Sequence, residues 1–163
     1  MHEKSPTRFQ QLLKVLVDHE VEFIVVGGVA AVLAGSPLPT IDLDAVYDTD
    51  PENLERLLGA LAEVGARYRD PADRHIVPSV EKLATLRMSL LLTNLGALDL
   101  LRIIGDGLTF QDLSGRTKEY DVSGLRIRAL DVETLIETKE FANRPKDRNA
   151  LLYLRQLLDM ESA

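Results

Sequence analysis

A short apolar run that ends at two glycines is the sequence feature that most constrains the fold. Phe23 to Val26 is apolar throughout and is followed by Gly27, Gly28 and then the small apolar residues Val29 to Leu33. An apolar run of this length before glycines is typical of a buried strand, and the residues after it predict a short helix that begins at the glycines. A strand that leads directly into a helix favours a layered fold in which helices cover a sheet.

Hydrophobic spacing predicts the other elements of the chain. The predicted helices cover residues 5–17, 50–65, 109–113, 131–141 and 145–158. The predicted strands cover residues 41–45, 86–92, 97–104, 120–122 and 125–129, and the last four form two hairpins. Residues 69–79 contain two prolines and are predicted as a loop or an edge segment. This order predicts an α/β or α+β fold with one mixed sheet flanked by helices.

Composition excludes several classes of protein. The chain has 163 residues and no Cys, which excludes a disulfide scaffold, a thiolate zinc site and a cysteine nucleophile. Its formal net charge of −7 argues against a protein that coats nucleic acid through bulk charge. The length predicts a single domain over residues 1–163. We expect a cytoplasmic protein without a membrane segment, because no apolar run approaches ~20 residues and no signal-peptide core is present.

The glycine pair permits a phosphate-binding interpretation. Glycine lets a phosphate approach the backbone, and the N-terminus of a helix offers free N–H groups. The sequence does not match the dinucleotide-binding Gly-x-Gly-x-x-Gly motif, because Val29 stands where the second glycine would be, and it does not match a P-loop. The alternative is that Gly27 and Gly28 only allow the helix to pack closely against the strand.

Two carboxylates alternate with apolar residues in the predicted strand 41–45. Asp42 and Asp44 are two residues apart, so they point to the same face of a strand, roughly 6.5 to 7 Å apart. Side chains placed in this way can flank one divalent ion or two, and the interleaved apolar residues are predicted to point into the core. Residues 42–55 carry six acids and no Lys or Arg, a local negative field that a cation would relieve. The alternative is an edge strand with solvated acids.

A third carboxylate, Asp99, lies within the otherwise apolar segment 97–101. A buried carboxylate is costly unless it is paired or bound to a metal. If its strand lies beside that of Asp42, three carboxylates meet, and Asp99 can act as a metal ligand or as the general base for an attacking hydroxyl. The alternatives are an outward-facing acid and an ion pair with a residue such as Arg102.

The C-terminal part of this acidic chain is basic. Residues 139–155 contain five Lys or Arg residues and two acids. Arg126 and Arg128 alternate on the preceding predicted strand and are expected to share the same face. Triphosphate and RNA both require such a patch, since Arg offers bidentate contacts to phosphate. The alternatives are an ordinary solvated helix surface and, for Lys139, a structural pair with Asp147.

Taken together, these motifs resemble the nucleotidyltransferase superfamily with a polymerase-β-like core. The resembling stretch runs from Phe23 to Asp44 and comprises a strand, Gly-Gly, a helix, a loop and a Thr-x-Asp-x-Asp motif that begins at Thr40. Residues 135–139 and the Arg-x-Lys-Asp sequence at 144–147 are similar to a second signature of the AbiEii-like and MenT-like toxin branch. The similarity covers most of residues 8–158. This branch belongs to bacterial toxin–antitoxin pairs.

The resemblance implies a function. It implies Mg²⁺- or Mn²⁺-dependent transfer of a nucleoside monophosphate from an NTP, with release of pyrophosphate. In MenT-like toxins the acceptor is the 3′ end of tRNA, so the resemblance implies a toxin that modifies RNA, blocks translation and is held in check by an antitoxin protein. The alternatives are transfer to a hydroxyl of a protein or of a small molecule such as an aminoglycoside, and a non-catalytic nucleotide-binding domain of the same fold.

The resemblance also implies roles for single residues. Asp42 and Asp44 would hold the metal, and Asp99 matches the third carboxylate of the wider superfamily. Lys139 would contact the triphosphate, and Asp147 would complete the site or orient Lys139. These five residues form the expected catalytic set.

Further residues are expected to bind the nucleotide. The predicted nucleotide-binding residues are Gly27, Gly28, Thr40, Lys139, Arg144 and Lys146. Thr40 is also the predicted site of a regulatory phosphorylation, because a phosphate so close to Asp42 would compete for the metal. Residues 131–159 are expected to form a helical pair that packs beside the active site.

Overall fold

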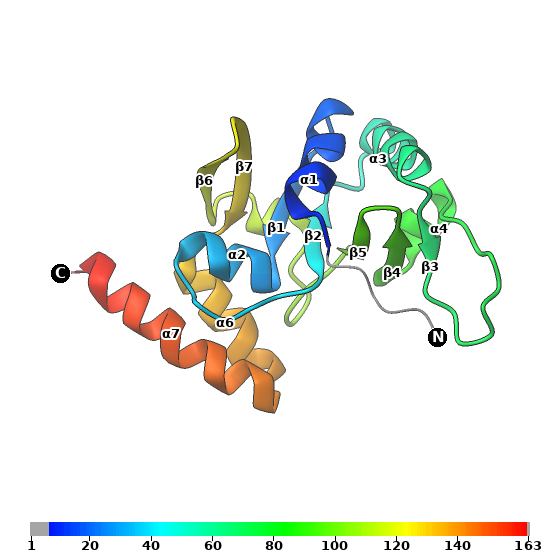
Figure 1. Ribbon diagram of the computed structural model, residues 1–163. Helices are drawn as coiled ribbons and strands as arrows, with labels where there is room; N and C mark the ends of the chain where they lie inside the picture. Colours follow the sequence, from blue (N-terminus) through cyan, green and yellow to red (C-terminus); the bar gives the residue numbers. More distant parts are fainter. Residues whose placement is uncertain (1–6, 163) are drawn as a thin grey trace.

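A mixed sheet of seven strands runs through the protein, with helices on both sides of it (Figure 1). This computed structural model describes residues 7–162. The strands are β1 (Phe23–Val26), β2 (Leu43–Tyr47), β3 (Arg67–Tyr68), β4 (Met88–Thr93), β5 (Gly96–Leu101), β6 (Thr117–Val122) and β7 (Leu125–Leu130). Their order across the sheet is β3-β4-β5-β2-β1-β7-β6. The predicted class, a mixed sheet flanked by helices, is confirmed.

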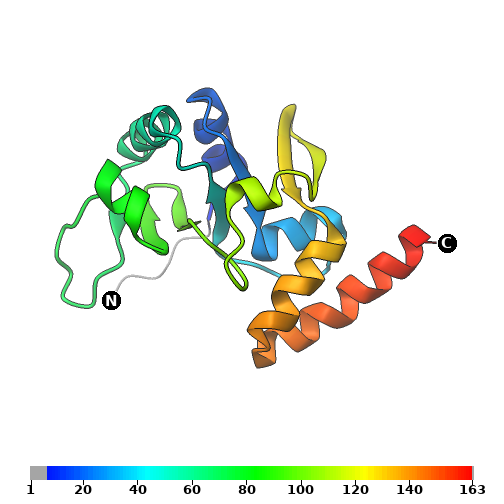
Figure 2. The same cartoon turned by 180° about the vertical axis from the view of Figure 1, so that it is seen from behind.

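The helices form two groups on opposite sides of the sheet. They are α1 (Phe9–Asp18), α2 (Gly27–Ala34), α3 (Pro51–Glu63), α4 (Val80–Thr85), α5 (Phe110–Leu113), α6 (Val132–Ala142) and α7 (Pro145–Ser162). α3 contacts both α1 and α4, whereas α2 contacts α6, which packs along α7. Figures 1 and 2 show the first group above the sheet and the second group below it. No helix within residues 7–162 is long and apolar enough to cross a membrane.

Most predicted elements are found within a few residues of their expected bounds. β1 matches its prediction, both hairpins are present, and the Asp131 side chain caps α6 by accepting a hydrogen bond from the Thr134 N–H at 2.8 Å. The predicted helix start at Ser5 and Pro6 lies outside the described residues. The sequence patterns do not predict α4, because its six residues bury only Leu83 and leave no helical period to detect.

Ile41 lies outside the core, contrary to the prediction for strand 41–45. β2 begins only at Leu43, so Ile41 belongs to the connection that follows α2, and it is 65% exposed. Leu43 and Ala45 are buried as predicted. Because strand residues alternate between faces, Asp44 is directed to the other side of the sheet.

One row of paired residues crosses the sheet at Asp44. Val26 of β1 pairs with Asp44 of β2, Asp44 pairs with Asp99 of β5, and Asp99 pairs with Leu90 of β4. Paired residues on neighbouring strands project from the same face. The strand of Asp99 therefore lies beside that of Asp44, which is the arrangement required for the predicted carboxylates to meet.

The face of β2 opposite the carboxylates is anchored by a buried tyrosine. Tyr47 is 1% exposed, and its hydroxyl donates a hydrogen bond of 2.6 Å to the carbonyl oxygen of Leu83 in α4. Burial, followed by the influence of Tyr68, raises the pKa of Tyr47 to about 12, so the phenol remains a hydrogen-bond donor throughout the physiological range. This bond connects the strand that carries the acids to the helices on the other side.

We expect Tyr47→Phe to lower the free energy of unfolding by about 1 to 2 kcal/mol, because the buried carbonyl of Leu83 loses its partner. Urea unfolding followed by circular dichroism measures the change. Tyr153→Phe on α7 is the matched control, since Tyr153 is 37% exposed and has no hydrogen-bonded partner in the described part of the chain. Equal stability of the two variants would contradict the anchoring role.

Candidate active site

Two acidic side chains on and next to β2 form the centre of the candidate site. Asp44 lies in β2 and Asp42 directly precedes the strand. The Oδ1 atoms of both are buried and have no hydrogen-bond partner. Buried polar atoms almost always have a partner. Two unpartnered carboxylate oxygens side by side therefore indicate a site for a cation.

The two glycines allow the backbone at the start of α2 to approach this centre. Gly27 has a φ of +65°, and a Cβ on it would lie 3.1 Å from Cγ of Asp44 and closer still to Oδ2. A Cβ on Gly28 would lie 2.8 Å from Cβ of Thr40. Close packing thus accounts for both glycines, and both also line the cavity next to the acids. The structural and the phosphate-binding interpretations of this pair are compatible.

Two cavities meet at the carboxylates. The first, of about 540 Å³, lies between the start of α2, the connection 36–41 and the α6–α7 junction. The second, of about 480 Å³, lies over β4 and β5 and is bounded by residues 103–105 and α6. The residues that line both are Gly27, Asp42, Asp44, Lys139, Arg144 and Lys146. Asp42 and Asp44 therefore lie where a molecule bound in one cavity would contact a molecule bound in the other.

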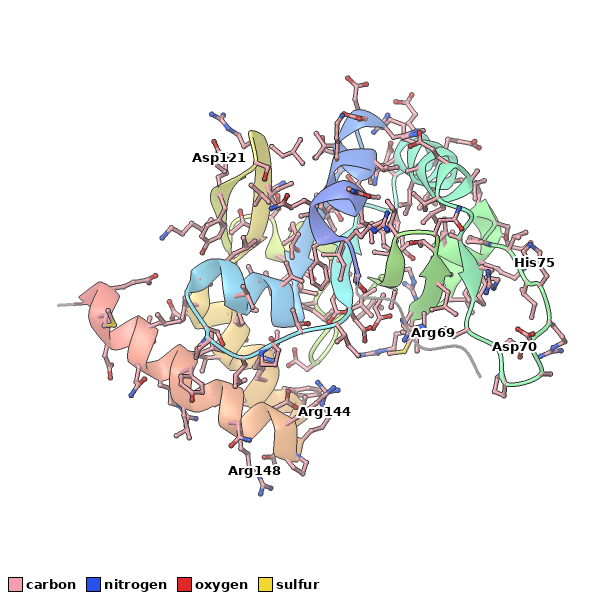
Figure 3. All side chains as sticks on the ribbon, viewed as in Figure 1. Arg69, Asp70, His75, Asp121, Arg144 and Arg148 are labelled. Atoms are coloured by element: carbon pink, nitrogen blue, oxygen red, sulfur yellow. The ribbon has the colours of Figure 1, made fainter. Side chains whose placement is uncertain are left out.

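Three of the predicted cations line the two cavities together with the carboxylates. Lys139 comes from α6 and its side chain is 16% exposed, and Arg144 and Lys146 lie at the start of α7. Figure 3 labels Arg144 below the sheet, directly before α7, and Arg148 in the first turn of that helix. Arg148 lines neither cavity, so the basic patch of the site is smaller than the basic segment of the sequence.

The two arginines of β7 do not join this face, contrary to prediction. Arg126 pairs with Glu119 across the hairpin, and Arg128 donates a hydrogen bond of 2.7 Å to the carbonyl oxygen of Ser114. Neither residue lines the two cavities. The period of two correctly placed them on one face of a strand, but it could not tell which neighbour that face meets.

Asp147 forms ion pairs with Arg144 and Lys139 and does not join the other acids of the site. Its side chain is 1% exposed, and it accepts hydrogen bonds from Nε of Arg144 at 2.7 Å and from the Arg144 backbone N–H at 3.1 Å. Nζ of Lys139 lies 3.6 Å away. Burial alone would raise the pKa of Asp147, but the hydrogen bonds of Arg144 and the charge of Lys139 outweigh it and hold the pKa below its usual value. Of the two roles expected for Asp147, this geometry suits the one that orients Lys139.

Asp99 has a counter-ion that sequence reasoning did not identify. Its carboxylate pairs with Arg69, which follows β3, whereas Arg102 donates to the carbonyl oxygens of Leu86 and Thr85 instead. Figure 3 labels Arg69 at this edge of the sheet. Within residues 7–162 no three acidic or histidine side chains are grouped so that they could hold a metal together. The metal-ligand role of Asp99 thus stays a prediction.

Burial and mutual repulsion change the acidity of the centre. Burial, and then the charge of Asp42, raise the pKa of Asp44 to about 6, although Lys146, Lys139 and Arg69 act in the opposite direction. The positive charges of the protein therefore do not fully offset the negative charge of the Asp44 carboxylate. A bound divalent cation would supply the missing compensation.

Thr40 lies at the rim of the same centre. It lines the first cavity, and its Oγ1 donates a hydrogen bond of 3.3 Å to the carbonyl oxygen of Asp42. A group attached to this hydroxyl would stand next to the metal-binding candidate. The predicted phosphorylation of Thr40 stays a prediction.

Comparison with solved structures identifies the fold. The chain is similar to the lincosamide antibiotic adenylyltransferase LnuA bound to lincomycin, with a TM-score of 0.64 and 17% identity over 95% of this chain and 99% of that chain. It is also similar to ANT(2″)-Ia in complex with adenylyl-2″-tobramycin, with a TM-score of 0.61 and 15% identity over 94% of this chain and 89% of that chain. No protein-family model and no curated protein matches the sequence. The chain thus has the fold of these nucleotidyltransferases.

We expect Asp44→Asn to stabilise the metal-free protein at neutral pH. The pKa of Asp44 rises from 3.8 to about 6 on folding. The folded state binds more protons between these two values, so stability falls as pH rises through that window. A shift of this size corresponds to roughly 2 to 3 kcal/mol. Urea unfolding in EDTA should show the gain at pH 7.5 and little difference near pH 4.

The matched control for this prediction is Asp159→Asn on the exposed side of α7, which should change stability little at either pH. Adding Mn²⁺ should raise the thermal unfolding temperature of the wild type more than that of Asp44→Asn, because a ligand bound only to the folded state stabilises it. An Asp44→Asn variant that is less stable than the wild type at pH 7.5 without metal would contradict the raised pKa.

Proposed function

We propose that the protein is a metal-dependent nucleotidyltransferase that transfers a nucleoside monophosphate from an NTP to the 3′ end of an RNA, with tRNA as the expected acceptor. The observation that carries this proposal is the pair of carboxylates with buried, unpartnered oxygens at the common wall of two cavities. The fold that the chain shares with two antibiotic adenylyltransferases supports the same reaction class.

Asp42 and Asp44 are the residues that would hold Mg²⁺ or Mn²⁺. Carboxylate oxygens are the ligands that these hard cations prefer. The buried Oδ1 atoms without partners fit this need. When bound, the metal would act as a Lewis acid that neutralises charge on the transferred phosphoryl group.

The first cavity is the proposed NTP site. It combines the N-terminal end of α2, which begins at Gly27, with Lys139, Arg144 and Lys146. Free N–H groups and cations of this kind stabilise phosphates. Lys146 has no ion-pair partner among residues 7–162, so its ammonium group is available to the triphosphate. Lys139 is held in place by Asp147 at 3.6 Å.

The reaction replaces a phosphoanhydride bond of the NTP with a phosphodiester bond to the acceptor. A bond forms between the acceptor hydroxyl oxygen and the α-phosphorus, and the bond from that phosphorus to the oxygen bridging to the β-phosphate breaks. Pyrophosphate leaves with those electrons, and the hydroxyl proton passes to solvent. The contribution of this chain is to position both reactants and to stabilise the negative charge of the pyrophosphate through Lys139 and Lys146, which is the main work in phosphoryl transfer.

Charge in the second cavity favours an anionic acceptor. Its cationic lining residues are Arg87, Lys139, Arg144 and Lys146. Its acids are the two proposed metal-binding residues, whose charge the metal would offset, and Asp99, which is paired with Arg69. Asp147 offsets part of the charge of Arg144 and Lys139. Arg87 and Lys146 are therefore the lining cations without a carboxylate partner among residues 7–162. An aminoglycoside carries several ammonium groups and would meet a positive surface, whereas an RNA end brings phosphates. A small neutral hydroxyl compound is the second candidate, because the same cavity has apolar walls.

A transfer assay tests the proposal. We expect the wild type, with Mg²⁺ and α-labelled NTP, to place label on RNA when incubated with total tRNA. Asp42→Asn and Lys139→Met should reduce transfer by about 100-fold or more, because each removes charge stabilisation at the reacting phosphate. Lys14→Met is the matched control, since Lys14 is 63% exposed and pairs with Asp18 on α1.

Other outcomes of this assay would contradict the proposal. Label on a lincosamide or on protein would move the acceptor to the second candidate or to a protein hydroxyl. Binding of NTP without pyrophosphate release, with every acceptor tested, would indicate a non-catalytic domain. Full activity in both site variants would refute the roles of Asp42 and Lys139.

The proposed toxin role rests on the resemblance of the motifs. Phosphorylation of Thr40, next to Asp42, is a way in which the activity could be inhibited. A phosphate on Thr40 adds about −1.5 to −2 charge beside Asp42 and would compete for the metal. We expect expression of the wild type to arrest bacterial growth, the Asp42→Asn variant to be harmless, and the product of a neighbouring gene to relieve the arrest. Normal growth at expression levels that give measurable transfer would contradict the toxin role, and the intact mass of the co-expressed protein reports phosphorylation.

A further inference from the structure

The β4 part of the sheet, next to the carboxylates, is exposed on one face, whereas α2 packs against the neighbouring strands β1 and β2. On β4 the residues Met88 and Leu90 are 50% and 37% exposed, whereas Ser89 and Leu91 between and after them are fully buried. The buried residues point to the α3 and α4 side of the sheet. The exposed ones therefore line an open apolar surface that forms part of the second cavity.

Two arginines of the edge strand region share this face. Arg67 pairs in register with Leu92, and the Arg69 N–H donates a hydrogen bond of 3.0 Å to the carbonyl oxygen of Leu90. Leu92 alternates with Leu90 on β4, and paired residues project from the same face. Because Arg69 is engaged by Asp99, its charge is already compensated. Arg67 has no carboxylate partner in the described part of the chain.

A further arginine borders the surface at its other end. Arg87 directly precedes β4 and lines the second cavity. Its guanidinium donates one hydrogen bond, of 3.2 Å, to the carbonyl oxygen of Gly105, and no carboxylate within residues 7–162 pairs with it. The open surface thus has an apolar middle and unneutralised cations on two sides, in a protein whose net charge is −7.

The surface leads to the reacting centre. Asp99, which is paired with Leu90 in register, lies next to Asp44 on the neighbouring strand. From β3 to β2 there are three strand spacings of about 4.8 Å, so the surface spans about 14 Å and ends at the carboxylates. A ligand that crosses the strands from the sheet edge would therefore pass the Arg69–Asp99 ion pair and present its end to Asp44.

We propose that this surface, made of Arg67, Arg87, Met88, Leu90 and Leu92 and called here the acceptor face, is the docking site for the single-stranded 3′ end of the acceptor RNA. The proposal rests on the proposed function. Bases contact the apolar middle, backbone phosphates contact Arg67 and Arg87, and the terminal hydroxyl lies at the carboxylates. Charge complementarity selects this occupant, because a polymer with planar bases and regularly spaced phosphates uses both an apolar strip and cations remote from the reaction.

Binding in the absence of NTP tests the acceptor face separately from catalysis. The probe is a fluorescein-labelled single-stranded RNA of about ten nucleotides, followed by fluorescence anisotropy. We expect Arg67→Glu and Arg87→Glu each to weaken binding about tenfold. In the corresponding Ala variants the slope of log Kd against log salt should fall by about 0.7 for each lost phosphate contact. Met88→Ala should weaken binding without changing that slope.

Two controls separate a local effect from misfolding. Arg126→Glu on β7 has the same charge change at a side chain that is 83% exposed, on the hairpin where Figure 3 labels Asp121, and it should leave RNA affinity unchanged. Affinity for a fluorescent ATP analogue should be unchanged in Arg67→Glu and Arg87→Glu, because these residues do not line the first cavity.

The outcomes distinguish a failure of the acceptor face from a failure of the proposed nucleotide transfer. RNA binding that Arg67→Glu and Arg87→Glu leave intact, or that every variant weakens equally, would overturn the acceptor face. Absence of RNA binding by the wild type would overturn both the acceptor face and the RNA acceptor. Binding that depends on the acceptor face without nucleotide transfer would retain the docking site and overturn the proposed function.

Discussion

The repulsion between two neighbouring carboxylates is the constraint on which the rest of the site depends. Asp42 and Asp44 lie side by side with buried oxygens that have no partner, and the pKa of Asp44 stays near 6 despite the surrounding cations. A protein selected only for stability would replace such a pair with neutral residues. Lys139 and Lys146 offset part of the repulsion, and the divalent cation that we propose to bind here would offset the remainder. An uncompensated pair of this kind, kept at a cost in stability, is typical of a functional site.

A single carboxylate, that of Asp147, holds together the two helices that carry the cations near Asp42 and Asp44. Asp147 lies in the first turn of α7, where it accepts the backbone N–H of Arg144 and so caps its own helix. The same side chain holds the guanidinium of Arg144 and lies 3.6 Å from Lys139 of α6. One buried group thus fixes the junction between α6 and α7 and the positions of two cations relative to β2. The structural and the functional interpretations of the Lys139–Asp147 pair describe the same contact.

What the sequence reveals about this fold depends on how far apart the interacting residues are. Local periodicity was enough to predict β1, the two hairpins and the strand of Asp44, although that strand begins only after Asp42. The capping residue Asp131 was enough to predict the start of α6. The Arg69–Asp99 pair joins residues 30 positions apart, and it depends on the register of a strand of only two residues. No local pattern encodes such a register. For the same reason, the sequence does not predict the exposed face of β4, because that exposure depends on which side of the sheet the helices cover.

In the proposed function, the choice of acceptor depends on residues away from the two carboxylates. Both cavities share the carboxylates and three cations, so the charges that hold a triphosphate act on the acceptor as well. A polycationic acceptor would need extra acids on the far wall of the second cavity, but that wall carries Arg87, apolar side chains of β4 and β5, and one acid, Asp99, which is paired with Arg69. The shared fold with LnuA and ANT(2″)-Ia, at 17% and 15% identity, leaves this wall free to differ. In the function that we propose, one scaffold keeps its phosphoryl-transfer centre while the exposed face of β4 decides which hydroxyl is presented to it.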